Sequence, residues 1–227
     1  MRLAAIFSGG KDSVLALHRA ATAGHEIVVL VTVCPELAES WMFHRPNVRW
    51  TELQAQALGL PHIVASTKGE KETELVDLKA ALVRARNEFG AEGAVSGALA
   101  SKYQKSRIDR LCAEIGMQSL APLWGANPAK LWDEMLKSGF EIVIAAVAAE
   151  GLGKEWLGRK IDKPALKELK KACAAHAIHL GFEGGEAETF VLDAPLFKKR
   201  IVIESASARW ARTSGTYEIE NARLAAK

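Results

Sequence analysis

The chain has 227 residues, of which 49% are hydrophobic and 25% are charged, and its formal net charge is +3. This composition is typical of a globular protein, and the small net charge gives no argument for nucleic acid as the partner. No apolar run reaches membrane-spanning length and the N-terminus enters a strand pattern at once, so we expect a cytoplasmic protein without a membrane partner.

The first predicted elements are a strand and a helix joined by two glycines. Residues 3–7 form a short apolar run that predicts a buried strand, and helical spacing begins after Lys11. Gly9 and Gly10 lack a Cβ atom, so the backbone between the two elements could approach an anion closely. Because amides at the start of a helix attract negative charge, the sequence predicts a phosphate-binding loop. An ordinary strand-to-helix turn is the alternative.

Strands and helices continue to alternate through the first half of the chain. Further buried strands are predicted at 26–33, 61–65, 93–98 and 119–123, with helices between most of them. Strand–helix–strand units place their strands parallel, so the sequence predicts an α/β, Rossmann-type nucleotide-binding sheet. A loop after the second strand contains His44. This loop could be a hydrophobic flap over the sheet or a lid over a nucleotide, with His44 as its polar tip.

The pattern changes near residue 125, where the regular alternation of strands and helices ends. We therefore predict two domains, a nucleotide-binding domain over 1–125 and a smaller α+β substrate-binding domain over 126–227. The second domain contains a loop, 181–189, with three glycines and three glutamates. An acidic turn of this kind is usually a solvated surface feature, and the alternative is a set of carboxylates that serve the active site.

Three cysteines, Cys34, Cys112 and Cys173, lie far apart in the sequence. They form no Cys-x-x-Cys pair, so the sequence predicts neither a zinc site nor a cluster site. Each cysteine is more typical of a small buried residue than of a reactive thiol.

Several motifs together resemble a known enzyme family. Ser-Gly-Gly-Lys-Asp-Ser at 8–13, between a strand and a helix, resembles the pyrophosphate loop of the PP-loop ATP pyrophosphatases, whose nucleotide-binding domain is HUP-like. Glu-Gly-Gly-Glu-Ala-Glu-Thr at 183–189 and Asp-Ala-Pro-Leu at 193–196 make the chain similar to the diphthine–ammonia ligase family in its short form. Met-Phe-His at 42–44 and the segment 96–107 look like the same family, so the resemblance spans nearly the whole chain.

The resemblance implies an ATP-dependent amide ligase. Members of this family activate the carboxylate of diphthine, a modified histidine on elongation factor 2, and amidate it with ammonia, releasing AMP and pyrophosphate. ATP and Mg²⁺ are the implied cofactors, and ammonium and the diphthine-bearing factor are the implied partners. The resemblance makes tRNA an unexpected partner, and the sequence leaves open whether the protein forms a homo-oligomer.

The resemblance also implies which residues act. ATP would contact Ser8, Gly9, Gly10, Lys11, Asp12, Ser13, Val33, Ser96 and Gly97, with Lys11 neutralising developing charge and Asp12 holding the metal ion. The substrate would contact His44, Tyr103, Arg107, Glu183, Glu186 and Glu188, and the catalytic residues would be Lys11, Asp12, Glu186 and Glu188. We expect the three glutamates to face the phosphate loop, where their charges would meet Mg²⁺, ammonium or the trimethylammonium group of diphthine.

Three other functions are compatible with the sequence. Bacteria do not make diphthamide, so a bacterial member of the family would amidate a different carboxylate. Other PP-loop enzymes modify tRNA. Those that thiolate tRNA usually need a catalytic cysteine near ATP, and Cys34 is the only candidate by position. A nucleotide-binding sensor without turnover is the third class.

Overall fold

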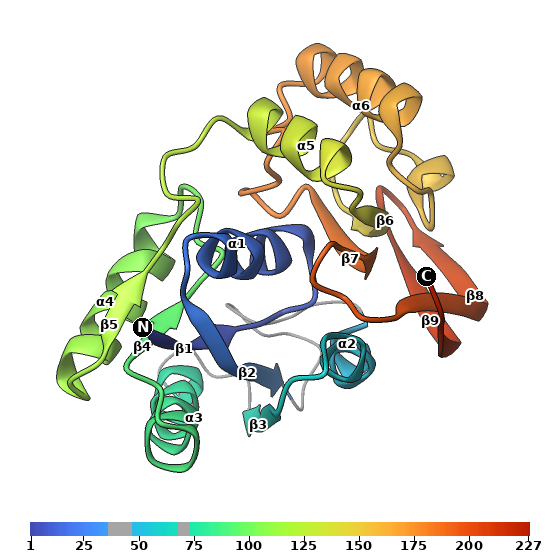
Figure 1. The fold of residues 1–227 in the computed structure, drawn as a ribbon. Helices are drawn as coiled ribbons and strands as arrows, with labels where there is room; N and C mark the ends of the chain where they lie inside the picture. The colour runs from blue at the N-terminus through green and yellow to red at the C-terminus, as the bar shows by residue number, and fades with distance from the viewer. Residues whose placement is uncertain (36–46, 68–72) are drawn as a thin grey trace.

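The N-terminal half of the chain folds around a parallel sheet. The computed structural model describes residues 1–35, 47–67 and 73–227. Five strands, β1 (Arg2–Ile6), β2 (Glu26–Pro35), β3 (His62–Thr67), β4 (Gly93–Val95) and β5 (Gln118–Leu120), form a sheet in the order β3-β2-β1-β4-β5 (Figure 1). All four strand pairings are parallel, which confirms the predicted nucleotide-binding architecture.

Helices cover both faces of this sheet. They are α1 (Lys11–Thr22), α2 (Thr51–Leu58, preceded by the 3₁₀ turn Val48–Trp50), α3 (Thr73–Phe89) and α4 (Lys102–Glu114). Leu3 and Ala5 of β1 pack with α1, whereas Ala4 packs with α3 and α4, because successive strand residues point to opposite faces. The neighbours of β1 are β2 on one side and β4 on the other. Such a switch point leaves a crevice at the carboxyl ends of the strands.

The C-terminal half forms a smaller antiparallel sheet. Its strands, β6 (Glu141–Val147), β7 (Ala187–Asp193), β8 (Arg200–Ala211) and β9 (Ser214–Ala225), lie in the order β7-β6-β9-β8. Helices α5 (Pro128–Lys137) and α6 (Lys163–Ala175) lie on one side of this sheet, together with the short 3₁₀ turn Lys154–Trp156 (Figure 1). The predicted α+β character of this half is therefore confirmed.

The two sheets share a hydrophobic core. One cluster of buried side chains contains Leu15 of α1, Trp132 of α5 and Phe190 of β7. The Arg19 guanidinium on α1 also forms an ion pair with Glu134 on α5 at 2.5 Å. The predicted boundary near residue 125 falls between β5 and α5, and the division into two domains stays a prediction. Within the described residues, no helix is both long enough and apolar enough to cross a membrane.

Candidate functional site

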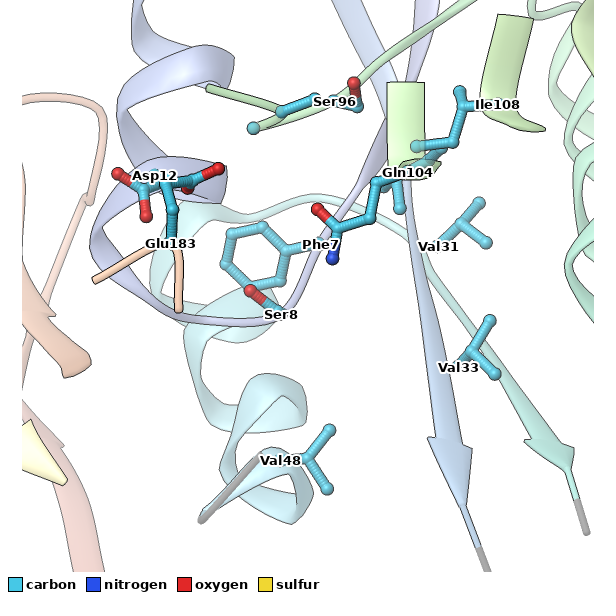
Figure 2. A pocket seen from close by; sticks show the side chains of 13 residues that line it. Phe7, Ser8, Asp12, Val31, Val33, Val48, Ser96, Gln104, Ile108 and Glu183 are labelled. Carbon is cyan, nitrogen blue, oxygen red and sulfur yellow. The ribbon is translucent and has the colours of Figure 1, made fainter. Parts of the chain in front are cut away.

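A cavity lies at the carboxyl ends of β1, β2 and β4, at the switch point of the parallel sheet. Figure 2 shows Asp12 and Glu183 on one side of it and the apolar side chains of Val31, Val33 and Ile108 on the other. The cavity therefore has a charged end and an apolar end. A ligand with an ionic part and a flat apolar part would match both ends.

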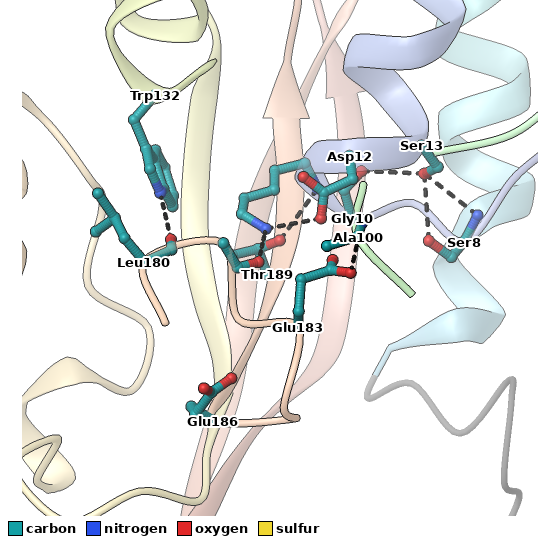
Figure 3. Close-up of polar contacts among 12 residues, drawn as sticks. Ser8, Gly10, Asp12, Ser13, Ala100, Trp132, Leu180, Glu183, Glu186 and Thr189 are labelled. Carbon is teal, nitrogen blue, oxygen red and sulfur yellow. Dashed lines mark hydrogen bonds and ion pairs between the residues drawn. The ribbon is translucent and has the colours of Figure 1, made fainter. Parts of the chain in front are cut away.

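The predicted phosphate loop forms part of the wall on the charged side. Gly9 has a φ of +76°, and a Cβ atom there would collide with the side chain of Gln54, so the position requires glycine. The Ser13 hydroxyl accepts hydrogen bonds from the Ser8 amide (3.3 Å) and hydroxyl (3.2 Å), and it donates to the Gly10 carbonyl (3.0 Å; Figure 3). These bonds close a compact turn, and the first helical amides after it have no acceptor inside the helix.

Residues from elsewhere in the chain clamp this loop in place. The Lys11 amide donates to the Thr189 hydroxyl on β7 (3.0 Å), and the Val191 amide donates to the Gly9 carbonyl (3.1 Å). The fully buried Gln54 side chain donates to the Gly9 carbonyl (3.0 Å) and to the Val191 carbonyl (2.8 Å). Sequence reasoning missed these contacts, because Lys11 and Thr189 are 178 positions apart and no local spacing connects them.

The Lys11 ammonium lies in the core between the two halves and does not line the cavity. The residue is only 4% exposed, and Nζ donates to the Asp12 carboxylate (2.7 Å) and to the Gly181 carbonyl (2.8 Å). The ring centroids of Phe182 and Trp132 lie 5.2 and 5.8 Å from Nζ, close enough for cation–π attraction. The ammonium is thus fully engaged with protein groups, and its predicted action on phosphate stays a prediction.

Val33, Ser96 and Gly97, the residues predicted to contact adenosine, all line the cavity. Ser96 is 3% exposed, and its hydroxyl has no hydrogen-bond partner among the described residues. Because a buried hydroxyl without a partner is costly, a ligand that bonded it would be favoured. A Cβ atom on Gly97 would lie 2.7 Å from the Asp12 carbonyl carbon, so this glycine allows the chain after β4 to approach α1.

Glu183 brings the acidic loop to the same cavity. Its Oε2 accepts hydrogen bonds from the Ala100 amide (3.0 Å) and the Ser101 amide (3.1 Å), just before α4 begins. These bonds fix the carboxylate at the start of a helix, where negative charge is stabilised. Glu183 and Asp12 therefore face one cavity from opposite ends of the chain.

Glu186 and Glu188 do not line this cavity, which corrects the expectation that all three glutamates face the phosphate loop. Glu186 accepts hydrogen bonds from the His179 amide (3.1 Å) and the Gly184 amide (2.9 Å), so it stabilises its own loop. Side chains alternate along β7, and Glu188 therefore points to the face opposite Thr189, which contacts the phosphate loop. Glu188 instead lines a second cavity, of about 370 Å³, beside the tip of the β8–β9 hairpin.

On α4, the residues that meet the cavity differ from those predicted. Gln104 and Ile108 line it, whereas Tyr103 and Arg107 do not. The Arg107 guanidinium stacks on the Tyr103 ring, with its central carbon 3.5 Å from the ring centroid. Tyr103 and Arg107 therefore pair with each other on the same helix as the lining residues, and their contact with the substrate stays a prediction. His44 lies outside the described residues.

Asp12, the predicted metal ligand, lies where a cation could bridge it to phosphates. Its carboxylate lines the cavity beside the phosphate loop, on the same side as Glu183. The described part of the chain contains no group of three or more histidine, cysteine or acidic residues that could hold a metal ion. Mg²⁺ at nucleotide sites is commonly bound by one or two carboxylates together with phosphate oxygens and water, so these two carboxylates fit such an ion.

The cysteines lack the thiolate character that sulfur chemistry requires. Burial raises the pKa of the Cys34 thiol, and burial also raises the pKa values of Cys112 and Cys173 to about 11. All three thiols are therefore protonated at neutral pH, whereas the thiolate is the reactive form. This result does not favour a thiolation reaction.

Two family models cover most of the chain. The model described as diphthamide synthase N-terminal domain matches residues 1–119, and the model described as diphthamide synthase C-terminal domain matches residues 127–225. The chain belongs to the diphthamide synthase family. The family resemblance noted in the sequence is thereby confirmed, and the two matched domains carry the two loops that meet at the cavity.

Two relatives of this diphthamide synthase family member, both named diphthine–ammonia ligase, support the same assignment. A Bos taurus protein named diphthine–ammonia ligase is 35% identical over 226 residues, which cover 90% of this chain and 84% of that protein. A Schizosaccharomyces pombe protein of the same name is 34% identical over 223 residues, which cover 89% of this chain and 36% of that longer protein. A solved structure described as a predicted subunit of tRNA methyltransferase from Methanocaldococcus jannaschii has a TM-score of 0.41 at 17% identity, covering 83% of this chain and 95% of its own.

Proposed function

We propose that this protein is an ATP-dependent ligase that amidates the carboxylate of diphthine on elongation factor 2 with ammonia, releasing AMP and pyrophosphate. One observation carries the proposal: Asp12 of the phosphate loop and Glu183 of the acidic loop line one cavity, although they come from opposite ends of the chain. The two diphthamide synthase family models match the residues of both loops, and relatives named diphthine–ammonia ligase cover about 90% of the chain.

ATP suits the two ends of this cavity. The phosphates would lie at the loop 8–13, where helix amides attract negative charge, and the adenosine would lie against Val31, Val33 and Ile108. The unpaired Ser96 hydroxyl would then gain a hydrogen-bond partner from the nucleoside. Asp12 would hold Mg²⁺, which supplies positive charge to the phosphates when bound.

The proposed reaction needs activation of the carboxylate, because a carboxylate and ammonia do not condense at neutral pH. A carboxylate oxygen of diphthine attacks the α-phosphorus of ATP, and the bond to pyrophosphate breaks. The nitrogen of ammonia then attacks the activated carbonyl carbon, the bond to AMP breaks, and the nitrogen loses a proton. Holding these groups together supplies much of the rate enhancement.

Glu183 is the acidic residue best placed to bind ammonium and accept that proton. One of its oxygens accepts the two backbone hydrogen bonds before α4, and the other accepts none from the described residues. A carboxylate in this position could accept hydrogen bonds from ammonium and take up the proton during attack. Glu186 would act by supporting the loop that carries Glu183, and Glu188 by shaping the second cavity.

The test uses the protein with ATP, Mg²⁺, ammonium and elongation factor 2 that bears diphthine. We expect AMP, pyrophosphate and the amide in equal amounts, measured by nucleotide chromatography and by mass spectrometry of the modified histidine. The matched control is the same factor with an unmodified histidine, which should give no AMP above background. ADP as the stoichiometric product would contradict the proposal, and AMP formation with other carboxylates alone would assign the enzyme a different substrate.

A further inference from the structure

Gln104 lies at the apolar end of the nucleotide cavity, and the reaction described above gives it no task. It belongs to the first turn of α4, and Figure 2 shows its side-chain amide directed into the cavity near Phe7 and Val31. Its backbone amide donates to Ser101 (3.3 Å), but no described residue forms a hydrogen bond with its side-chain amide. Both atoms of this amide are therefore free to pair with a ligand.

The apolar walls alone cannot choose between purine bases. Val33 and Ile108 offer only aliphatic groups, whose dispersion contacts with adenine and guanine rings are nearly equal. Hydrogen bonds discriminate much more strongly, because a wrong base leaves polar groups unpaired. The charged side chains of Asp12 and Glu183 lie on the opposite side of the cavity, and Gln104 is the only amide side chain among its described lining residues.

We propose that Gln104 determines the specificity for adenine. Its Oε1 accepts a hydrogen bond from the exocyclic N6 amino group, and its Nε2 donates to the ring nitrogen N7 on the same edge of the base. Glutamine is well suited to this pairing, because adenine presents a donor beside an acceptor. Guanine presents a carbonyl at the position of the amino group and so places two acceptors on the corresponding edge. This inference rests on the proposed function, since it requires ATP to bind in this cavity.

The decisive experiment compares ATP with purine riboside triphosphate, which lacks only the N6 amino group. The wild-type protein should bind ATP about 10- to 100-fold more tightly than the analogue, measured by titration calorimetry, because the analogue leaves Oε1 unpaired. The Gln104→Leu variant should bind both nucleotides with similar dissociation constants. A role of Gln104 in folding alone would lower both affinities together and leave their ratio unchanged.

A second variant tests the donor atom of the amide. Gln104→Glu keeps the size of the side chain but can only accept hydrogen bonds when ionised. 7-Deaza-ATP lacks the N7 acceptor, so the wild type should bind ATP about tenfold more tightly than 7-deaza-ATP, whereas Gln104→Glu should bind both nucleotides with similar dissociation constants. The matched control is Gln118→Glu, an exposed residue of β5, which makes the same chemical change outside the cavity and should keep the wild-type preference for ATP over 7-deaza-ATP.

The outcomes separate this inference from the proposed function. If the wild-type protein binds ATP but Gln104→Leu retains the full preference over purine riboside triphosphate, the role of Gln104 is overturned and the ligase proposal stands. A full preference for ATP over 7-deaza-ATP in Gln104→Glu would also overturn it. If the wild-type protein neither binds nor cleaves ATP, both proposals fail. Thermal unfolding of each variant ensures that only folded proteins are compared.

Discussion

At the scale of single residues, Lys11 shows how a side chain can serve the site without entering it. Burying an ammonium group is strongly unfavourable unless other groups replace its hydration. Here the Asp12 carboxylate, the Gly181 carbonyl and two aromatic rings do so. Since Gly181 is two positions before Glu183, Lys11 connects the residues that hold Asp12 and Glu183 in the cavity wall. The sequence points to Lys11 as a candidate site residue, but it does not show where the side chain points, because that depends on partners far away in the chain.

Lys11→Met should slow turnover more than it weakens ATP binding. Methionine keeps the apolar stem but leaves the Asp12 and Gly181 acceptors without their donor, which should cost about 1–3 kcal/mol of folding stability. Because the ammonium does not line the cavity, we expect kcat to fall about tenfold and KM for ATP to change by less than about threefold. Steady-state kinetics measures both constants. A larger change in KM than in kcat would show that the ammonium reaches the phosphates.

Asp12→Asn should abolish most of the metal-dependent activity while the fold is retained. Asparagine has nearly the same shape and still offers Lys11 an oxygen acceptor, so the unfolding midpoint should change little. Loss of one preorganised charge at the phosphates should reduce turnover about 10²-fold. AMP release measured over a range of Mg²⁺ concentrations should show a weaker metal dependence than in the wild type. Turnover equal to that of the wild type would rule out Asp12 as the metal ligand.

At the scale of elements, the sequence predicts those helices and strands whose own residues show a regular spacing of apolar side chains. The apolar run of β1 and the helical spacing of α1 correctly predicted a strand and a helix joined by the turn at Gly9 and Gly10, because strand and helix periods are local properties. The strand β4 ends at Val95, three residues before its predicted end, since Ser96 and Gly97 leave the sheet to line the cavity. The position of the acidic loop was not predictable in detail, because it depends on how β7 pairs with distant residues.

The glutamates of the acidic loop provide a matched pair of variants. Glu183→Gln keeps one oxygen for the Ala100 and Ser101 amides but removes the charge that faces the cavity. We expect ATP affinity to be retained, amide formation to fall about 10²-fold, and the KM for ammonium to rise.

The control is Glu186→Gln, which can keep at least one bond to the loop and lies outside the cavity. It should change amide formation by less than about fivefold, since its effect acts through loop stability. Ammonium titrations of amide formation measure both variants. A larger loss in Glu186→Gln than in Glu183→Gln would reverse the assigned roles.

At the scale of the whole molecule, the two halves are held together by packing and by an ion pair between α1 and α5. Apolar stripes in a sequence show that an element is buried, but they do not show which sheet covers it. For this reason the change of pattern near residue 125 could be seen, whereas the common core of Leu15, Trp132 and Phe190 could not. The ion pair of Arg19 and Glu134 belongs to the same contact between halves.

This ion pair predicts a pH-dependent part of the stability. Hydrogen bonds from Arg19 lower the pKa of Glu134 below its usual value of 4.5. A lowered carboxyl pKa stabilises the folded state above the unfolded value and loses that contribution as the pH falls through the folded value. Both side chains are about one-third exposed, so solvent limits the contribution to about 1 kcal/mol or less.

Urea unfolding of the wild type and of Glu134→Gln at several pH values measures this contribution. The wild type should be more stable at pH 7, and the difference should disappear once the pH falls well below about 4.5. Glu150→Gln, an exposed residue of the same half, serves as the control and should give no pH-dependent difference. A difference between wild type and Glu134→Gln that stays constant with pH would contradict the assignment.

The clamp on the phosphate loop determines when the nucleotide site can form as the chain is synthesised. The Lys11 amide and the Gly9 carbonyl find their partners at Thr189 and Val191, so most of the chain must leave the ribosome before the loop is complete. Domains generally fold in order from the N-terminus, but the contacts of this loop form only after β7 has been synthesised. A ligand stabilises only the form that binds it, so ATP would stabilise full-length folded molecules and not nascent or truncated chains, which lack the complete site.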